Sequence, residues 1–346
     1  MSIAVAVSGG ADSLLSLLLL KEQGLDPIAL HGSFLPPGPG AGPLQENLTS
    51  LCKELDIPLH ICRLHDEFHQ LVIAPFIRSY CSGRTPNPCA WCNRSVKFGL
   101  LLNQARALGA DRLATGHYVR KAEAGPRLYR GLDPFKDQSY FLALITREQV
   151  SRACFPLGVW RKDNVPEALR DRGCTAPIKQ ESQEVCFIPD NDYRAFLEAS
   201  GQDLPQPGPI MDSSGAVLGR HHGLHRYTVG QRRGLGIAAS RPLYVLRKNL
   251  RRNALVVGPR NELQALSCHV RELNCLLEPA HWPRQVLVQT LYRQDPKPAS
   301  VAFETSQLLK IDFQEPITPA TPGQVAAFYL PTGRLIGGGI IHQECA

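Results

Sequence analysis

The sequence predicts an α/β protein that ends in a β-rich part. Buried strands alternate with helices up to about residue 196, which is typical of a doubly wound parallel sheet. A turn-rich segment, "GQDLPQPGPIMDSSG" (201–215), then interrupts the pattern. From about residue 264 onward, short apolar segments are separated by turns, and this spacing favours a small β-barrel.

The first third of the chain contains the expected elements of the parallel sheet. Residues 3–7, "IAVAV", form a continuous apolar run, as in a strand buried on both faces. The helix that follows, to about residue 24, contains "LLSLLLL", which is far shorter than the roughly 20 apolar residues of a membrane span. Further elements are expected at 26–32 (strand), 44–55 (helix), 58–62 (strand), 65–80 (helix), 93–108 (helix) and 111–115 (strand).

The strands of the β-rich part are expected in its apolar segments. These are "RQVLVQTLY" (284–292), "VAFET" (301–305), "LLKIDF" (308–313), "QVAAFYL" (324–330) and "RLIGGGII" (334–341).

Composition indicates a soluble globular protein of two or three domains, with 346 residues of which 43% are apolar. The net charge of +7 is compatible with an acidic partner but does not identify one. The start of the chain has no basic leader of an export signal, so we expect a cytoplasmic protein without a membrane partner. Its 11 cysteines are then expected to be thiols or ligands rather than disulfides.

The segment "SGGADS" (8–13) joins the first strand to the first helix. Consecutive glycines let the backbone approach a ligand closely, and the helix N-terminus behind them presents unpaired N–H groups to a phosphate. Ser8 and Ser13 add hydroxyl donors, and Asp12 could orient a hydroxyl or assist Mg²⁺. The pattern is neither Walker A nor G-x-G-x-x-G, and it resembles the pyrophosphate-binding loop (PP-loop) of ATP pyrophosphatases. The plain alternative is a tight strand-to-helix turn.

Cys89 and Cys92 stand two residues apart in "NPCAWCN" (87–93). Taken alone, the pair is compatible with a zinc site, a dithiol redox pair, a metal cluster or two unrelated buried thiols. A structural zinc site needs four ligands, which usually come as two such pairs. The sequence has no second CxxC.

Further motifs follow in a fixed order along the chain. They include "GRTPNPCAWCNRSVKFG" (83–99), "ATGHYVR" (114–120), "GLDPFKDQSYFLALI" (131–145), "KQESQEVCFI" (179–188) and "GRHHGLHRYTVGQRRGLGI" (219–237). Together with the glycine loop, these motifs resemble the tRNA-specific 2-thiouridylase family over nearly the whole chain. The resemblance implies a PP-loop ATP-binding and catalytic domain (1–196), a small basic central tRNA-binding domain (197–263) and a C-terminal β-barrel domain (264–346). It also implies ATP-dependent 2-thiolation of the wobble uridine (U34) of tRNA, a transferase reaction in which uracil O2 is adenylated and then replaced by sulfur.

The resemblance also implies roles for individual residues. ATP would contact Ala6, Val7, Ser8, Gly9, Gly10, Ala11, Asp12, Ser13, Gly32 and Gly116. The target base would contact Asn87, Pro88 and Cys89, and tRNA would contact Lys136, Asp137, Gln138 and Tyr292. Cys92 takes the position of the nucleophile, and Cys186 in "EVCF" takes the position that carries a persulfide.

The chain departs from the family pattern at three places. Cys89 stands where the family often has Asp, segment 32–43 is shorter than usual, and Leu291 replaces a common basic residue. Arg84, Arg94 and Lys97 flank the cysteine pair, and their positive charge is expected to favour a thiolate.

Cys89, Cys92 and Cys186 make three thiols, and three thiolates can hold a [4Fe–4S] cluster with one iron left open to deliver hydrosulfide. We expect that arrangement from the sequence. The alternative needs no metal: Cys186 carries a persulfide, Cys92 attacks it, and a Cys92–Cys186 disulfide remains. Zinc is a third candidate.

Residues 213–261 contain ten Lys or Arg and no Asp or Glu. This pattern is typical of a track for a phosphate backbone, with Arg232 and Arg233 as candidate tRNA contacts, although a solvated surface would look similar. Trp91 could stack on a flipped base or shield the site. For His117 we expect a place in the nucleotide pocket or a packed polar position rather than acid–base catalysis.

Three hypotheses follow for the activity. The first is thiolation of U34, and the second is a PP-loop enzyme that thiolates another tRNA position. The third is a tRNA-binding or sulfur-carrying protein without turnover, against which the intact "SGGADS" and "NPCAWCN" argue. The expected partners are tRNA and a sulfur donor, which could be a desulfurase, a relay protein or sulfide.

Overall fold

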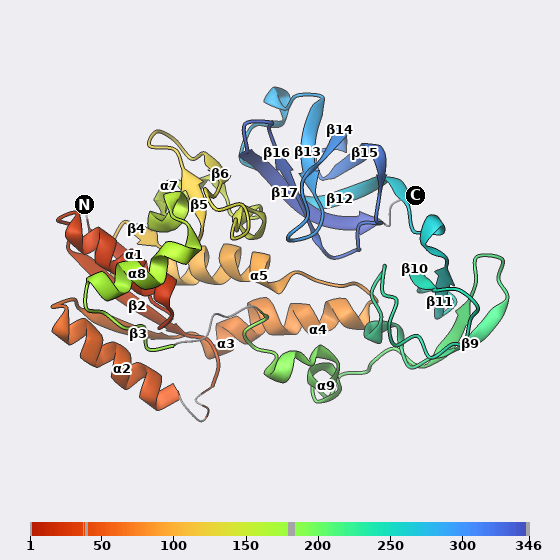
Figure 1. Cartoon of the computed structure of the whole chain (residues 1–346), viewed down its shortest axis with the longest axis horizontal. Coiled ribbons are helices and arrows are strands. Elements are labelled where there is room, and N and C mark those ends of the chain that lie inside the picture. Colours follow the sequence, from red (N-terminus) through yellow and green to blue (C-terminus); the bar gives the residue numbers. More distant parts are fainter. Residues whose placement is uncertain (1, 37, 39–40, 179–183, 344–346) are drawn as a thin grey trace.

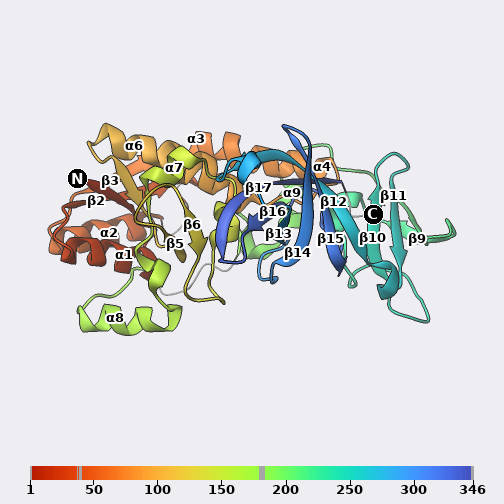
Figure 2. The same cartoon turned by 90° about the horizontal axis from the view of Figure 1, so that it is seen from above.

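A computed structural model of the chain describes residues 2–36, 38, 41–178 and 184–343. Figure 1 shows an α/β region, a barrel and a smaller sheet, and the view from above in Figure 2 agrees that the barrel lies between the other two along the long axis. The predicted fold class, α/β with a doubly wound parallel sheet, a central part and a C-terminal β-barrel, is confirmed.

The first sheet is parallel throughout and has β1 at its centre. Its strands, in spatial order, are β3 (Leu59–Arg63), β2 (Pro27–Ser33), β1 (Ile3–Ala6), β4 (Arg112–Ala114) and β7 (Ala153–Cys154). The chain therefore moves to one side of β1 for two strands and to the other side for the next two. The carboxyl ends of β1 and β4 border the point where the direction changes, which is where open α/β sheets bind ligands.

Helices cover both faces of this sheet because successive side chains of a strand point to opposite faces. Ile3 and Val5 pack in one apolar cluster with residues of α1 (Ala11–Glu22) and α2 (Ala41–Glu54). Ala4 packs in another cluster with residues near α6 (Leu102–Ala107) on the opposite face. The continuous apolar run of β1 thus reflects burial on both sides.

Two long helical stretches run from the α/β region toward the barrel and the central sheet (Figure 1). Each contains a π-helical segment. This form is rare in proteins as a whole, but where it occurs it is often at a functional site. The first consists of α3 (His65–Phe68), the π-helical His69–Ile73 and α4 (Ala74–Cys81). The second consists of α5 (Pro88–Trp91), the π-helical Cys92–Leu101 and α6.

The central part of the chain forms its own mixed sheet around a small apolar core. Its strands, in spatial order, are β10 (Tyr244–Asn249), β11 (Ala254–Gly258), β8 (Gly208–Met211) and β9 (Val217–His221).

The C-terminal strands close into a barrel because the first of them, β12, pairs with both β15 and the last strand, β17. The strands, in order around it, are β12 (Ala265–Cys275), β15 (Leu308–Ile317), β14 (Lys297–Thr305), β13 (Gln285–Gln289), β16 (Val325–Tyr329) and β17 (Arg334–Gln343). The sequence predicted all of these strands except β12.

A hairpin from the first region of the chain extends the barrel sheet. β6 (Leu128–Arg130) pairs with β17 and with β5 (Val119–Lys121). The sequence predicted no strands here, and the pairing ties the α/β region to the barrel.

The remaining helices are short. They are α7 (Arg147–Arg152), α8 (Val165–Asp171), α9 (Tyr193–Glu198) and the 3₁₀ turns Ser139–Leu142, Pro156–Val159, Lys162–Asn164, Pro189–Asn191, Leu224–Arg226, Arg260–Glu262 and Pro279–His281. None of the helices in the described ranges combines the length and the apolar character needed to cross a membrane.

Candidate functional site

The glycine loop, residues 8–13, follows β1 at the ligand-binding edge of the parallel sheet. Gly9 has a φ of +88°, and Gly10 is the N-cap of α1 without a side-chain cap. The Ser13 hydroxyl donates to the Gly10 carbonyl at 2.9 Å and accepts from the Ser8 N–H at 3.2 Å. Because no side chain caps α1, its first N–H groups are available to an anion.

Gly116 follows β4 and meets the glycine loop from the other side of the crevice. A Cβ at this position would lie 2.9 Å from the carbonyl carbon of Asp12 and 3.0 Å from the nitrogen of Ser13. Only a glycine therefore fits without displacing the start of α1. The structure brings Gly116 to the loop as the sequence led us to expect, and its contact with ATP stays a prediction.

The other predicted ATP contacts also lie at this edge. Ala6 ends β1 and Ala11 begins α1. The Val7 N–H donates to the Leu30 carbonyl at 2.8 Å. That register places Gly32, near the end of β2, beside the start of the loop.

Asp12 is held by two side chains that sequence analysis did not identify. Lys162 Nζ lies 2.7 Å from both carboxylate oxygens, and the Tyr118 hydroxyl donates to Oδ1 at 2.6 Å. Mg²⁺ could use Asp12 only if Lys162 moved away. Lys162 is 150 positions from Asp12 in the chain, and no local pattern marks it.

The cysteine pair begins the second long helical stretch. The Asn87 side chain caps it by accepting from the Ala90 N–H at 3.2 Å, and Pro88 occupies the first turn, where its missing N–H costs nothing. Cys89 and Cys92 are three residues apart and so share a helix face. Cys186 acts electrostatically on both, which brings the three predicted thiols into one neighbourhood.

Burial, more than positive charge, determines the state of these thiols. It raises the pKa of Cys89, Cys92 and Cys186, that of Cys92 to about 12, while the Lys97 ammonium opposes the rise in each case. Cys186 keeps part of its surface in solvent, but the surrounding protein still raises its pKa. The resting thiols are therefore protonated, which corrects the expectation of a thiolate.

Lys97 reaches the thiols because of the π-helical geometry. Cys92 and Lys97 are five residues apart in the π-helical segment, whose i→i+5 hydrogen bonds place them one turn apart. Arg84 and Arg94, the other two cations expected to act on the thiols, line a separate cavity together with Trp91. That is a second correction.

The donor set does not fit a metal cluster in this arrangement. Within residues 2–36, 38, 41–178 and 184–343, no group of three or more His, Cys, Asp or Glu side chains is placed to hold a metal ion. A Cys89/Cys92/Cys186 cluster stays a prediction of the sequence, and we derive no reaction step through it.

His117 directly follows Gly116, and the charge of Lys97, which acts on the thiols, also acts on its ring. Its ring is buried, and its Nδ1 lies 2.7 Å from the Thr115 hydroxyl. Burial, followed by the Lys97 charge, holds its pKa well below the usual range. The neutral, hydrogen-bonded ring fits a packed polar residue better than an acid–base catalyst.

The predicted tRNA contacts at Lys136, Asp137 and Gln138 occupy one loop with different exposure. Asp137 is buried and accepts from Arg130, Gly131 and Ser139 at 2.8–3.1 Å. Its carboxylate therefore shapes the loop. The Gln138 side chain accepts from the Tyr118 N–H at 3.1 Å, and the Lys136 side chain is half-buried. Direct contact of these residues with tRNA stays a prediction.

The second long helical stretch, residues 88–107, carries Cys89 and Cys92 and is called the cysteine helix below. Tyr292 of the barrel lies beside its start. Its ring centroid is 4.4 Å from that of Phe141 and 6.3 Å from that of Tyr140. The Tyr140 hydroxyl in turn hydrogen-bonds to the Asn87 side chain and to the Val325 carbonyl. Predicted tRNA contacts from three distant parts of the sequence thus gather in one region. Arg232 and Arg233 are exposed in the central part.

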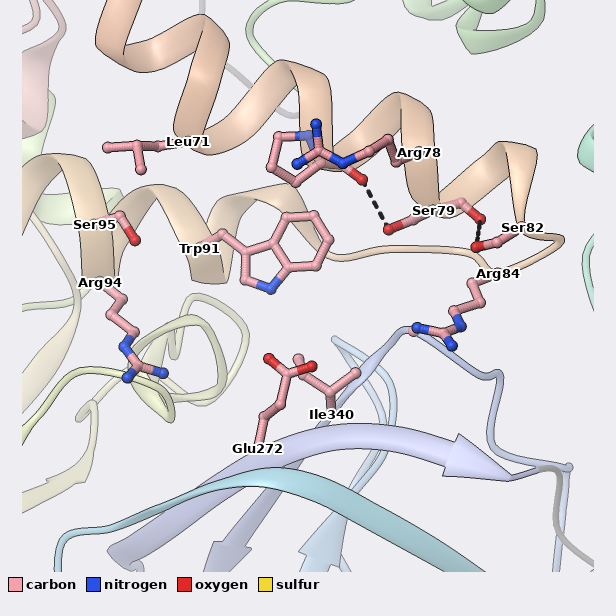
Figure 3. Close-up of a pocket in the computed structure, with 12 residues that line it drawn as sticks. Leu71, Arg78, Ser79, Ser82, Arg84, Trp91, Arg94, Ser95, Glu272 and Ile340 are labelled. Carbon is pink, nitrogen blue, oxygen red and sulfur yellow. Dashed lines mark hydrogen bonds between the residues drawn. The ribbon is translucent and has the colours of Figure 1, made fainter. Parts of the chain in front are cut away.

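A cavity of about 580 Å³ opens between the cysteine helix and the barrel. Figure 3 shows Trp91 directed into it, with Arg78, Arg84 and Arg94 around its upper and side walls and Glu272 rising from the barrel. Sequence analysis did not identify this cavity, because its walls come from both long helical stretches and from β12 and β17, which are far apart in the sequence.

Comparison with known proteins gives matches along the whole chain. The family model for the tRNA methyl transferase HUP domain matches residues 1–190, that for the tRNA methyl transferase PRC-barrel domain matches residues 194–259, and that for the aminomethyltransferase beta-barrel domain matches residues 265–341.

Curated relatives of similar length share about half of the sequence. The chain is 51% identical over 348 residues to "tRNA-specific 2-thiouridylase MnmA" of Nitratidesulfovibrio vulgaris (strain DSM 19637 / Miyazaki F), with 99% of both chains covered. It is 48% identical over 352 residues to the protein of the same name from Oleidesulfovibrio alaskensis, again with 99% of both chains covered. The protein of that name from Lawsonia intracellularis is 44% identical over 358 residues, covering 99% of this chain and 100% of the relative.

Proposed function

The chain belongs to the tRNA-specific 2-thiouridylase family, and from this premise we propose that it uses ATP to replace O2 of the wobble uridine, U34, of tRNA with sulfur. As a tRNA sulfurtransferase it carries the activity that names its relatives. The observation that supports the finer proposal is the position of Lys97. This one cation acts on His117, next to the crevice at the glycine loop, and on all three thiols. Nucleotide chemistry and sulfur chemistry would therefore share one site.

The first step is activation of the uracil carbonyl, whose oxygen is a poor leaving group. Attack of O2 on the α-phosphate of ATP forms an adenylate and releases pyrophosphate. The uncapped N-terminus of α1, together with the Ser8 and Ser13 hydroxyls, would hold the phosphates. Mg²⁺ is expected to accompany ATP, and we assign it no ligand on this chain.

The second step brings sulfur to C2. With a persulfide on Cys186, the Cys92 thiolate attacks Cys186 Sγ, forming a Cys92–Cys186 disulfide and releasing hydrosulfide. The terminal sulfur is reduced to sulfide as the two cysteine sulfurs are oxidised. Hydrosulfide then adds to C2, and AMP leaves with the former O2. Cys186 is reloaded in one of two ways. A desulfurase or relay protein passes the terminal sulfur of its own persulfide to Cys186 after a thiol reductant has reopened the Cys92–Cys186 disulfide. Alternatively, sulfide attacks the Cys186 sulfur of that disulfide, which forms the Cys186 persulfide and releases the Cys92 thiolate without any further oxidant.

Because its resting pKa is about 12, Cys92 needs help to become a thiolate. Lys97 is placed to supply it, because an ammonium near a thiol favours the charged form. Binding of the substrate would exclude water and strengthen that interaction. Cys89 has no required part in this scheme.

The test is reconstitution with the full-length chain, an unmodified tRNA transcript carrying U34, ATP and a persulfide donor. We expect 2-thiouridine at position 34, one pyrophosphate per sulfur, and loss of product in the Cys92→Ala and Cys186→Ala variants. Cys174→Ala, which alters a thiol outside this neighbourhood, serves as the control. A thionucleoside at another position would show that the acceptor is wrong.

The same experiment separates the two forms of sulfur chemistry. Without a cluster, Cys89→Ala retains most activity and the aerobically purified enzyme works. If anaerobically reconstituted protein contains about four irons and matching acid-labile sulfide, and Cys89→Ala abolishes both iron binding and activity, the thiol-only scheme is wrong.

A further inference from the structure

The cavity beside Trp91 is not explained by adenylation or sulfur transfer. Trp91 lies between Cys89 and Cys92 in the sequence, on a helical turn whose thiols face Lys97. Its side chain points into the space above the barrel (Figure 3), where none of the described lining residues is a cysteine. A helix with its side chains is roughly 10–12 Å across, so the cavity is separated from the thiols by one helix. It is close enough for a neighbouring part of the same substrate.

The charge of the cavity favours an anionic ligand. Arg78, Arg84 and Arg94 line it, and no carboxylate within the described part of the chain pairs with any of them. Two of the three serines in the wall already donate to backbone carbonyls, Ser79 to Pro75 at 2.8 Å and Ser82 to Ser79 at 2.9 Å (Figure 3). Three guanidinium groups therefore remain for a ligand, and guanidinium matches phosphate geometry.

One carboxylate opposes these cations from the barrel, in a strained position. Glu272 has a φ of +53°, in the left-handed region that costs a residue with a side chain. It sits where the pairing of β12 with β17 shifts register between Arg271 and Asn274. Such bulges redirect side chains and are frequent beside functional sites. Here the bulge directs Glu272 toward Trp91 (Figure 3), and no cation among the described residues pairs with it.

An aromatic face, unpaired guanidinium groups and one acceptor-only carboxylate are complementary to a nucleotide. A base stacks on a tryptophan, phosphates bind arginine, and a carboxylate accepts from an exocyclic amino group or ring N–H on the base edge. A simple anion would gain nothing from Trp91 and would be repelled by Glu272.

We propose that this cavity receives a second nucleotide of the tRNA anticodon loop, unstacked from its neighbours, with its base on Trp91, a donor on its edge bonded to Glu272 and its phosphate among Arg78, Arg84 and Arg94. The inference rests on tRNA being the substrate. It makes Trp91 and Glu272 positioning and specificity residues, which act while the target uridine is on the thiol side of the helix. A base that offers an amino group is preferred over uracil.

The test uses the fluorescence of Trp91 and an anticodon stem-loop without ATP, so that no chemistry is needed. We expect the stem-loop to quench the wild-type protein and the Trp160→Phe variant alike, and to lose that part of the signal with Trp91→Phe. Stem-loops with one abasic loop position at a time identify the bound nucleotide. A single position other than 34 should remove the Trp91-dependent quenching.

Thiolation kinetics provide the second readout. Trp91→Leu should lower kcat/KM for tRNA roughly tenfold, because leucine has no ring on which a base can stack. Trp91→Phe keeps an aromatic ring and should retain most of the wild-type kcat/KM. Glu272→Gln should alter the preference among stem-loops that differ only at the identified base. The KM for ATP and the alkylation rate of Cys186 should not change in any of these variants, which shows that the fold is intact.

Several outcomes overturn the inference while leaving the proposed function standing. These are wild-type thiolation with unchanged kinetics in Trp91→Leu and Glu272→Gln, quenching that survives every abasic substitution outside position 34, or equal quenching by a free mononucleotide at the same concentration. If the wild-type protein thiolates no tRNA but still shows position-dependent quenching, the proposed function fails and the cavity remains an RNA site.

Discussion

Lys97 is the side chain on which the reactivity of the thiols depends. It lowers the pKa of Cys89, Cys92 and Cys186 against the larger opposing effect of burial. Burial alone would leave three inert thiols, of the kind common in protein cores. Because the Lys97 ammonium offsets only part of the effect of burial, the thiolate is a minor species in the resting protein. We expect the thiolate fraction to rise when the substrate binds.

The first prediction concerns this balance and its pH dependence. Below its pKa, a thiol gains tenfold in thiolate for each pH unit, so single-turnover sulfur transfer by the wild type should rise with pH from 7 to 9. In Lys97→Met the pKa of Cys92 rises further, and the rate at pH 7.5 should fall at least about tenfold, which is the effect of one pKa unit. Lys97→Arg should retain much of the rate.

The measurement is 2-thiouridine formation after mixing persulfide-loaded enzyme with adenylated tRNA, together with iodoacetamide labelling of Cys92. Lys53→Met, which removes a lysine from the last turn of α2, is the control. A rate that is independent of pH, or a Lys97→Met variant that reacts like the wild type, would exclude Cys92 thiolate formation as the limiting factor.

The second prediction concerns the ion pair between Lys162 and Asp12. Lys162 bonds both oxygens of a carboxylate at the start of α1, where the phosphates of ATP are expected. We expect Lys162 to transfer to the phosphates when ATP binds. Lys162→Met should therefore raise the KM for ATP at least about tenfold, as loss of one charge-assisted contact does.

A purely structural ion pair would behave differently. If Lys162 only neutralised Asp12, the double variant Lys162→Met/Asp12→Asn would regain ATP affinity together with stability. Isothermal titration with ATP and thermal unfolding, run on the single and double variants, separate the two roles.

At the level of elements, the crevice between β1 and β4 depends on close contact between the backbone after β4, at Gly116, and the backbone at the start of α1. Gly116 has no room for a side chain because the start of α1 lies against it. The third prediction is that Gly116→Ala displaces the N-terminus of α1 and weakens ATP binding more than it weakens the fold. A crowded substitution of this kind costs about 1–3 kcal/mol of stability.

Gly42→Ala is the matched control. A Cβ there meets no atom within 4 Å, and Gly42 lies in α2, where alanine is the better helix former. ATP titration and thermal unfolding should show an intact or slightly more stable protein with unchanged affinity. Equal ATP affinity in both variants would mean that Gly116 is not at the nucleotide site.

The π-helical segment Cys92–Leu101 also acts at this level. In a regular α-helix Cys92 and Lys97 would point about 140° apart, whereas the wider π-helical turn brings them closer to one face. Val96, which is fully buried, packs in the same apolar cluster as Cys92, while the Lys97 ammonium lowers the pKa of that thiol against the effect of burial.

At the scale of the whole molecule, the barrel anchors the segment that leads into the cysteine helix. The Gln324 side chain donates to the Thr85 carbonyl at 2.9 Å and to the Pro86 carbonyl at 3.0 Å. The Thr85 N–H donates to the Pro322 carbonyl at 2.9 Å. Any movement of the barrel on binding tRNA would therefore reach Asn87 and the thiols directly.

The fourth prediction concerns the central part and its excess of cations. Arg232 and Arg233 are exposed and are expected to contact phosphates. The double variant Arg232→Gln/Arg233→Gln should weaken binding to all tRNAs alike and flatten the slope of log affinity against log salt by up to about 2.

Binding at several salt concentrations, measured by filter retention, checks this prediction. The control double variant Lys53→Gln/Arg106→Gln removes the same charge from the exposed surface of the α/β region. An equal change in both slopes would indicate a general effect of net charge and no phosphate track in the central part.

Sequence patterns alone determined the fold class, most of its elements and the family, which the structure and the comparisons confirm. They could do so because burial periodicity and the glycine loop are local properties, written in consecutive residues. The loop, Gly116 and the three cysteines were likewise visible as motifs.

The tertiary structure alone decided what lies opposite each motif. Lys162 meets Asp12 across 150 residues, a hairpin at 119–130 joins the barrel sheet, and Glu272 reaches Trp91 from another part of the chain. It also reversed the expected charge state of the thiols, because desolvation depends on every neighbour in space and only Lys97 of the three flanking cations faces them. Contacts of this kind follow from how the elements pack, which no local stretch of sequence records.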